Sequence, residues 1–156
     1  MIDQMVNITP YMQKGIGVLF GTCEKPKPKK CTWVHKTNPF ADYVQPFENG
    51  SGSFDFVRFW HFIMSSELGI MFILRRAIQM LKTGGFLLIC EATERVEGNP
   101  QYFNYGEMEG ILMLFDDFIH IDAKGINADG KTYFFVCRKQ GKVELKQEGV
   151  DAVKVS

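Results

Sequence analysis

The sequence has no excess of charge of either sign, because 18 basic residues are matched by 18 acidic ones. A balanced charge provides no long-range field toward nucleic acids or anionic membranes, so nucleic-acid binding is not expected. Long hydrophobic runs are also missing. The apolar stretch 68–74 contains Gly69 and is followed by Arg75, well short of the ~20 residues of a membrane-spanning helix. The first residues lack the pattern of a secretory signal, and we expect an intracellular protein, in the cytoplasm or an organelle interior.

Cysteine is scarce, and none of the four cysteines belongs to a Cys-x-x-Cys motif. Cys23 and Cys31 could bind zinc together with His35, but their spacing matches no common set of four zinc ligands. Cys90 and Cys137 lie in apolar stretches, where a small buried thiol is common. We therefore expect reduced thiols and no metal site.

Two common catalytic motifs are missing as well. The sequence contains neither the phosphate-binding pattern Gly-x-x-x-x-Gly-Lys-Ser/Thr nor the Gly-x-Ser-x-Gly elbow of serine hydrolases. Residues 50–53 (Gly-Ser-Gly-Ser) have glycines at neither spacing and are interpreted as a turn. Residues 24–30 are rich in lysine and contain Pro26 and Pro28, which predicts a basic, solvated loop.

The length of 156 residues and a hydrophobic content of 46% fit one domain with one sizeable core. We expect this domain to span residues 1–140, with residues 1–40 the least regular part. Residues 141–156 mix charge with isolated valines, which predicts a solvated extension.

Hydrophobic periodicity predicts the elements. Short strands are expected at residues 15–21 and 31–35, buried strands at 54–59 and 86–90, and a hairpin of strands 119–124 and 131–138. A helix should begin at Ser65–Glu67 and end near Lys82, with Gly84 and Gly85 just beyond it. A second helix is expected at 105–115. The expected core is Phe56, Val57, Leu74, Ile78, Leu88 and Phe135, buried together.

The buried strands have no polar side to expose to water, so helices are expected on both faces of the sheet. The order of elements then predicts an α/β fold with a mostly parallel sheet and a C-terminal antiparallel hairpin.

Three passages, in their order and spacing, resemble the class I S-adenosylmethionine-dependent methyltransferases. They are residues 41–47 (Ala-Asp-Tyr-Val-Gln-Pro-Phe), residues 53–57 (Ser-Phe-Asp-Phe-Val) and residues 81–89, in which Leu-Lys-Thr-Gly-Gly precedes a buried strand. Thr83 stands where that family usually has proline. The resemblance covers roughly residues 15–139 and implies a Rossmann-like fold with S-adenosylmethionine as the cofactor.

The resemblance also implies site residues. Asp42 lies within one residue of the family's acid beside the adenine, and Phe59, Trp60 and His61 follow the strand where the family places cofactor and substrate contacts. His61 is the candidate general base, because an imidazole titrates near neutrality. Aromatic packing is the alternative for Phe59 and Trp60, and a turn or structural role for Asp42 and His61. Glu91 and Glu94 follow the next strand and could orient a substrate.

Gly15 and Gly17 are candidate cofactor-binding residues with two alternative placements. In the first, residues 15–18 resemble the family's second strand, and Leu19 occupies the place of the acid that binds the ribose. In the second, Gly15, Gly17 and Gly21 form the cofactor loop itself. Neither reproduces the family's glycine pattern, so the N-terminal half is predicted to be truncated or degenerate, and the isolated chain is predicted to bind the cofactor weakly or not at all.

Two functions follow from this resemblance. The favoured one is a degenerate methyltransferase-like domain that serves as a structural or binding subunit of a larger assembly, because the groups needed for packing remain while those that bind the cofactor are missing. The alternative is an active methyltransferase on an unidentified acceptor, completed by a partner chain. A partner, as a homodimer or larger complex, is expected at an exposed apolar patch formed by Val18, Leu19, Phe20 and Trp33 and extended by Phe40, Phe47 and Phe59.

Overall fold

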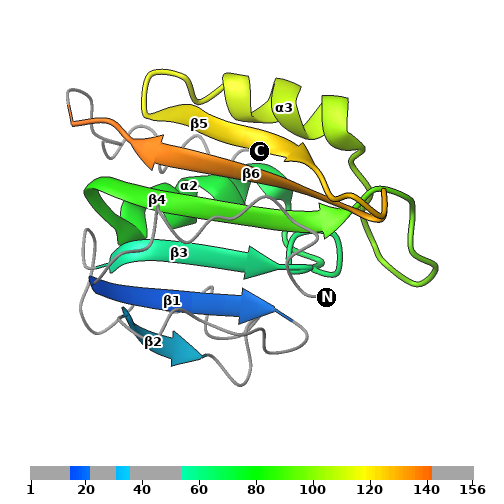
Figure 1. The fold of residues 1–156 in the computed structure, drawn as a ribbon, viewed down its shortest axis with the longest axis horizontal. Coiled ribbons are helices and arrows are strands. Elements are labelled where there is room, and N and C mark those ends of the chain that lie inside the picture. Colours follow the sequence, from blue (N-terminus) through cyan, green and yellow to red (C-terminus); the bar gives the residue numbers. More distant parts are fainter. Residues whose placement is uncertain (1–14, 22–30, 36–53, 142–156) are drawn as a thin grey trace.

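The computed structural model describes residues 15–21 and 31–35 as backbone strands, and residues 54–141 with their side chains. The described residues form a six-stranded sheet in the order β2-β1-β3-β4-β6-β5 (Figure 1). Its strands are β1 (Gly15–Gly21), β2 (Cys31–His35), β3 (Phe54–Trp60), β4 (Leu81–Ala92), β5 (Ile119–Ile126) and β6 (Thr132–Lys139). Two helices are described, α2 (Ile70–Met80) and α3 (Tyr105–Met113).

The sheet confirms the predicted fold class. β1 pairs in parallel with β2 and β3, and β3 pairs in parallel with β4. β6 then pairs antiparallel with both β4 and β5, which makes the expected C-terminal hairpin. The hairpin turns at Gly130, whose φ of 75° lies in the left-handed region open to glycine. The structure is therefore a Rossmann-like α/β sheet that is parallel on one side and antiparallel on the other.

The strand order reverses between β1 and β3. From β1 the chain goes outward to β2, and it returns to add β3 and β4 on the other side of β1. β1 therefore has the place that a doubly wound sheet gives to its first strand. This corrects both placements of the N-terminal glycines, since residues 15–21 are neither a second strand nor a loop.

The six predicted core residues are all buried, but they are not together. Val57, Leu74, Ile78 and Phe135 belong to the larger apolar cluster, between the sheet and α2, whereas Phe56 and Leu88 belong to a smaller cluster on the opposite face. The prediction of a single cluster was wrong because successive strand residues point to opposite faces of a sheet.

Both described helices pack on the face of the larger cluster, to which α3 contributes Met108 and Leu112. The α3 helix begins with a capping box, in which Asn104 accepts from the Glu107 amide and the Glu107 side chain accepts from the Asn104 amide. The smaller cluster on the opposite face is also buried, but neither described helix packs on it, so the helix expected on that face stays a prediction. Neither α2 nor α3 is long and apolar enough to span a membrane.

The bounds of α2 differ from the prediction at both ends. The helix begins at Ile70 rather than at Ser65–Glu67. Ser66 instead accepts from the Leu68 amide at 2.9 Å, so it stabilises a turn before the helix. The helix ends at Met80, and Gly84 and Gly85 lie within β4, beyond the helix end. The predicted C-terminal extension, apart from Gly141, lies outside the described residues.

Candidate functional site

The carboxyl ends of β1 and β3 meet at the point where the strand order reverses. Gly21, the last residue of β1, pairs with Trp60, the last residue of β3, and Trp60 pairs on its other side with Cys90 of β4. In Figure 1 these ends lie on the right of the sheet. Open α/β sheets bind their ligands outside the carboxyl ends of the strands at such a reversal. This edge is therefore the candidate site.

His61 directly follows β3 at this edge and has an unusual backbone. Among the described residues it is the one non-glycine with a positive φ, at 53°. Its amide donates to the Cys90 carbonyl at 3.0 Å, and its carbonyl accepts from Ser65 Oγ at 2.7 Å. Its ring lies edge-on to the Trp60 ring, with 4.7 Å between centroids. A left-handed non-glycine residue costs about 1–3 kcal/mol and persists where its surroundings impose it, often at functional sites.

Residues 61–69, here called the post-β3 segment, are held by the carboxylate of Glu91. Glu91 lies near the end of β4, is 1% exposed, and accepts from the Ile63 amide at 2.8 Å. Burial raises the pKa of Glu91 to about 7, and backbone hydrogen bonds from Ile63, Met64 and Phe62 oppose that rise. The carboxylate thus points into the protein, so the expectation that Glu91 orients a substrate was wrong.

Residues 93–104, here called the post-β4 segment, contact the post-β3 segment through Gln101. The Gln101 Nε2 donates to the carbonyls of Ile63 at 3.0 Å, Ser66 at 2.9 Å and Leu68 at 2.7 Å. Its backbone amide donates to the Met64 carbonyl at 3.3 Å. The two segments that leave the carboxyl ends of β3 and β4 are therefore joined by side-chain hydrogen bonds.

Sequence reasoning missed Gln101 entirely. Its partners lie 33 to 38 residues away in the chain. No motif surrounds it, and its spacing from those partners has no periodicity that a sequence pattern would show.

The predicted aromatic residues belong to the core. Phe59 is fully buried in the larger cluster and stacks on Phe62, with 5.2 Å between centroids. Trp60 is 8% exposed and packs in the cluster of the opposite face. The expectation that Phe59 extends an exposed apolar patch was wrong, because no part of it reaches the surface. The other predicted patch residues lie outside the residues whose side chains are described.

The remaining predicted site residues are scattered or outside the described residues. Gly15 begins β1, and Gly17 pairs with Trp33 and Phe56 within the sheet, so neither lies at the strand end beside His61. A cofactor-binding role for these glycines stays a prediction. Asp42 lies outside the described residues.

Within residues 54–141 and the strands β1 and β2, no group of three or more acidic, histidine or cysteine residues could hold a metal. The side chains of Cys90 and Cys137 are buried, as predicted.

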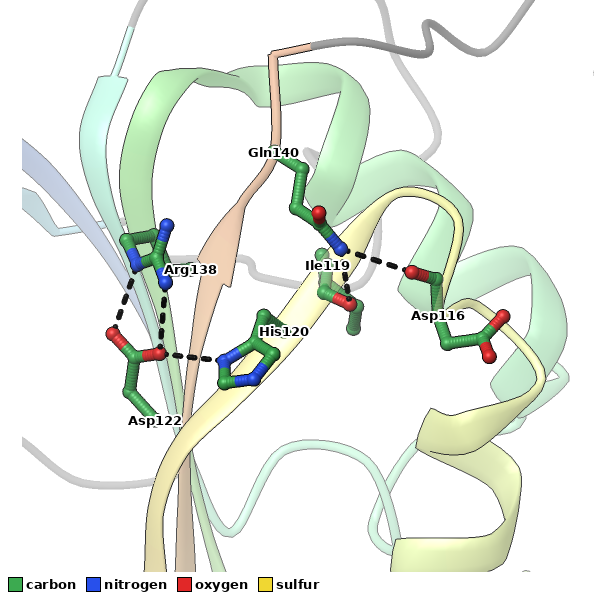
Figure 2. A network of polar contacts seen from close by, with 6 residues as sticks. All are labelled: Asp116, Ile119, His120, Asp122, Arg138 and Gln140. Atoms are coloured by element: carbon green, nitrogen blue, oxygen red, sulfur yellow. Dashed lines mark hydrogen bonds and ion pairs between the residues drawn. The ribbon is translucent and has the colours of Figure 1, made fainter.

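A second polar cluster lies on the hairpin of β5 and β6 (Figure 2). Its Arg138 pairs with Phe86 on β4, several residues before Cys90 at the candidate site. Asp122 accepts from Arg138 Nε at 3.0 Å, and its other oxygen lies 2.8 Å from His120 Nδ1. Burial opposes ionisation of Asp122, but hydrogen bonds from Arg138 and His120 outweigh it and lower the Asp122 pKa. A register shift between Ile121 and Ala123 leaves Asp122 as the extra residue of a β-bulge. All three side chains are partly or largely exposed, so the cluster fastens the two strands at the surface.

A groove of about 270 Å³ lies between α3 and the first half of β5. Its lining includes Leu112, Met113, Ile119 and Ile121, with Glu109 and Lys124 in contact at one side. β5 runs in the same direction as β4, so the beginning of β5 lies at the edge of the sheet opposite His61. The groove is therefore separate from the carboxyl-end site.

Comparison with known proteins gives a match at the level of structure. No protein-family model matches the sequence, and no curated protein does. An S-adenosylmethionine-dependent methyltransferase from Thermotoga maritima is similar, with a TM-score of 0.56 and 15% identity over 89% of this chain and 88% of its own. A Haloferax volcanii methyltransferase in complex with a methyltransferase activator has a TM-score of 0.56 and 10% identity over 76% of this chain. This chain covers 65% of that protein's length, less than two thirds.

A third similar structure is the 1,6-didemethyltoxoflavin N1-methyltransferase of Burkholderia thailandensis with S-adenosylhomocysteine bound. Its TM-score is 0.53, with 10% identity over 82% of this chain and 72% of its own. At such identities the likeness shows the fold alone. The chain therefore has the fold of the class I S-adenosylmethionine-dependent methyltransferases.

Proposed function

We propose that this domain binds S-adenosylmethionine at the carboxyl ends of β1 and β3. The observation that carries the proposal is the position of His61, a left-handed non-glycine residue directly at the reversal of strand order. Ligands of open α/β sheets bind at that reversal, and backbone strain concentrates at functional sites. The bound S-adenosylhomocysteine of the Burkholderia relative supports the choice of cofactor.

The types of residue at this edge are suited to binding a nucleoside cofactor. Gly21 ends β1, and a glycine allows a ligand to approach the backbone closely. Burial is described for three of the predicted site residues. Phe59 and Trp60 are buried, whereas the side chain of His61 is partly exposed. The resemblance assigns Asp42 to the adenine. β2 ends at His35 rather than at an acid, so the carboxylate that the family uses for the ribose is not at that strand end. Weak binding by the isolated chain is expected for this reason.

The reaction that such a site would serve is methyl transfer. S-adenosylmethionine supplies an electrophilic methyl group on a sulfonium centre. His61 would act on the acceptor, by taking the proton from its nitrogen or oxygen as that atom becomes nucleophilic. The ring contact with Trp60 and the two backbone hydrogen bonds of His61 would keep the imidazole in place.

A second function is favoured by a separate observation. Glu91 and Trp60, which could carry binding or chemistry at this edge, are used for packing: Glu91 binds backbone amides of the post-β3 segment, and Trp60 lies in the core. Because Glu91 and Trp60 stabilise the fold, they support the alternative of a structural or binding subunit in a larger assembly, as a homodimer or with another protein.

Calorimetric titration of the purified chain with S-adenosylhomocysteine and S-adenosylmethionine tests the first proposal. Weak but saturable binding is expected, with loss of affinity in His61→Ala and none in the control His120→Ala, which changes a histidine of the hairpin cluster. The absence of binding at ~1 mM ligand, a free energy weaker than about −4 kcal/mol, would leave the structural subunit as the better proposal.

Transfer of a labelled methyl group separates an enzyme from a binding subunit. Tritium from S-adenosylmethionine should appear in a component of the native extract with the wild-type chain and not with His61→Ala. Binding of the cofactor with no transfer to any component would favour the subunit.

A further inference from the structure

Two side chains of opposite hydrogen-bonding character hold the post-β3 segment. Glu91 can only accept when ionised, and it binds an amide of the segment. Gln101 donates through its side-chain nitrogen, and it binds three carbonyls of the segment. Ile63 is bound by both, through its amide and its carbonyl. The end of β4 and the post-β4 segment thus supply both kinds of partner to one irregular piece of chain.

The segment needs these partners because it is buried. Ile63, Met64 and Ser66 are each no more than 1% exposed. Residues 61–69 belong to no helix or strand, so their backbone groups bind partners outside a regular ladder, such as the Cys90 carbonyl, Glu91 and Gln101. A buried backbone group without a partner costs about 1–3 kcal/mol, and three carbonyls of the segment bind the side-chain nitrogen of Gln101, although that of Ile63 also accepts from the Ser66 amide. The path of the segment therefore depends on Gln101.

Gln101 is itself fixed to the sheet. The Tyr102 hydroxyl donates to the Thr93 carbonyl at 2.6 Å, within the post-β4 segment. The Tyr133 hydroxyl of β6 donates to the Phe103 carbonyl at 2.7 Å. Hydrogen bonds on both sides of Gln101 thus tie the post-β4 segment down, and a rigid support makes the carboxamide an anchor for the segment that begins at His61.

We propose that Gln101 is a positioning residue of the cofactor site, which keeps His61 at the reversal of strand order by anchoring the rest of the post-β3 segment. This inference rests on the proposed binding of S-adenosylmethionine at that edge. Gln101 acts through the backbone of residues 63–68 and contacts no cofactor atom.

The chain contains a matched control. The Gln140 Nε2 donates to the carbonyls of Asp116 at 2.9 Å and Ile119 at 3.2 Å, as Figure 2 shows. It performs the same kind of anchoring on the segment before β5, at the edge of the sheet opposite His61. Gln140→Met and Gln101→Met therefore remove the same chemistry from two places, only one of which is next to the proposed site.

The experiment combines hydrogen exchange with calorimetry on the full chain. In Gln101→Met, amide exchange in residues 61–69 should become at least tenfold faster, and affinity for S-adenosylhomocysteine should fall at least tenfold. Gln101→Glu should do the same or more, since a carboxylate would face three carbonyl oxygens. Gln140→Met should speed exchange near residues 116–119 and leave affinity unchanged.

The outcomes are distinguishable. Affinity unchanged in both Gln101 variants would overturn the positioning role, even with faster exchange. An equal loss of affinity in Gln140→Met would also overturn it, because general destabilisation would then explain both. Failure of the wild-type chain to bind would overturn the proposed function, whereas the exchange data, which need no ligand, would still support or overturn the anchoring of residues 61–69 by Gln101.

Discussion

The carboxylate of Glu91 accepts a hydrogen bond of 2.8 Å from the amide of Ile63, 28 residues earlier in the chain. This contact joins the end of β4 to the segment that follows β3, across two parallel strands. Since Glu91 is buried, ionisation of its carboxyl carries a cost in the folded protein that it lacks in the unfolded chain. The contact that positions the candidate site is therefore also sensitive to pH.

The first prediction concerns the pH dependence of stability. The pKa of Glu91 is about 7 in the folded protein against an ordinary 4.5. Between these values the folded state binds more protons than the unfolded state, so the free energy of unfolding falls as the pH rises from 4.5 to 7. The loss should be on the order of 3 kcal/mol and complete above pH 7.

Urea denaturation at several pH values measures this loss, with Glu91→Gln as the comparison. The glutamine keeps an oxygen that accepts from the Ile63 amide and does not ionise in this range, so most of the decline should disappear. An equally steep decline in Glu91→Gln would assign the pH dependence to other groups.

The second prediction separates the two faces of the sheet. Leu74 and Leu88 are both fully buried but belong to different clusters. Each change to alanine should lower the free energy of unfolding by about 2–5 kcal/mol. Because no cluster contains both, their effects should add within about 0.5 kcal/mol in the double variant. Leu114→Ala is the control: Leu114 is 69% exposed, and a change within about 0.5 kcal/mol is expected.

The third prediction uses two glycines with different surroundings. A Cβ at Gly85 would lie 2.8 Å from the Asp55 carbonyl oxygen and 2.9 Å from that of Lys82, and neither backbone atom can move aside cheaply. Gly85→Ala should therefore destabilise the protein, by about 1–3 kcal/mol. A Cβ at Gly110, within α3, would meet nothing within 4 Å. Gly110→Ala should stabilise the protein by up to about 1 kcal/mol, because alanine is the better helix former. Thermal unfolding should therefore show a lower melting temperature for Gly85→Ala and a higher one for Gly110→Ala.

Periodicity predicted most of the fold, because the pattern of apolar and polar residues that favours a strand or a helix lies within the residues of that element. The bounds of β1 and β2 were predicted to the residue, and the hairpin of β5 and β6 was predicted with its antiparallel pairing. Leu88 shows the limit of this reasoning. Its apolar character predicts burial, but its neighbours Leu87 and Ile89 are apolar as well, so the sequence does not show which of the two buried faces Leu88 occupies.

The candidate site was predictable in position only. The resemblance placed it after β3, where His61 lies. The side chains that shape this edge, Glu91 and Gln101, act across 28 to 38 residues on backbone groups. Backbone amides and carbonyls are the same at every residue, so no sequence pattern marks which of them a distant side chain will bind. The left-handed backbone of His61 was hidden for the same reason, because the backbone groups of His61 bind Cys90 and Ser65, and no sequence pattern marks either contact.

The last prediction separates the backbone of His61 from its imidazole. His61→Gly and His61→Ala remove the same ring and its contact with Trp60, but only glycine accepts a φ of 53° without strain. His61→Gly should therefore be more stable than His61→Ala by about 1 kcal/mol, as chemical denaturation can measure. If the imidazole serves the cofactor site, both variants should lose affinity for S-adenosylhomocysteine to a similar degree. An alanine variant as stable as the glycine variant would show that the left-handed conformation is not imposed by the fold, and would remove the strain argument from the proposed site.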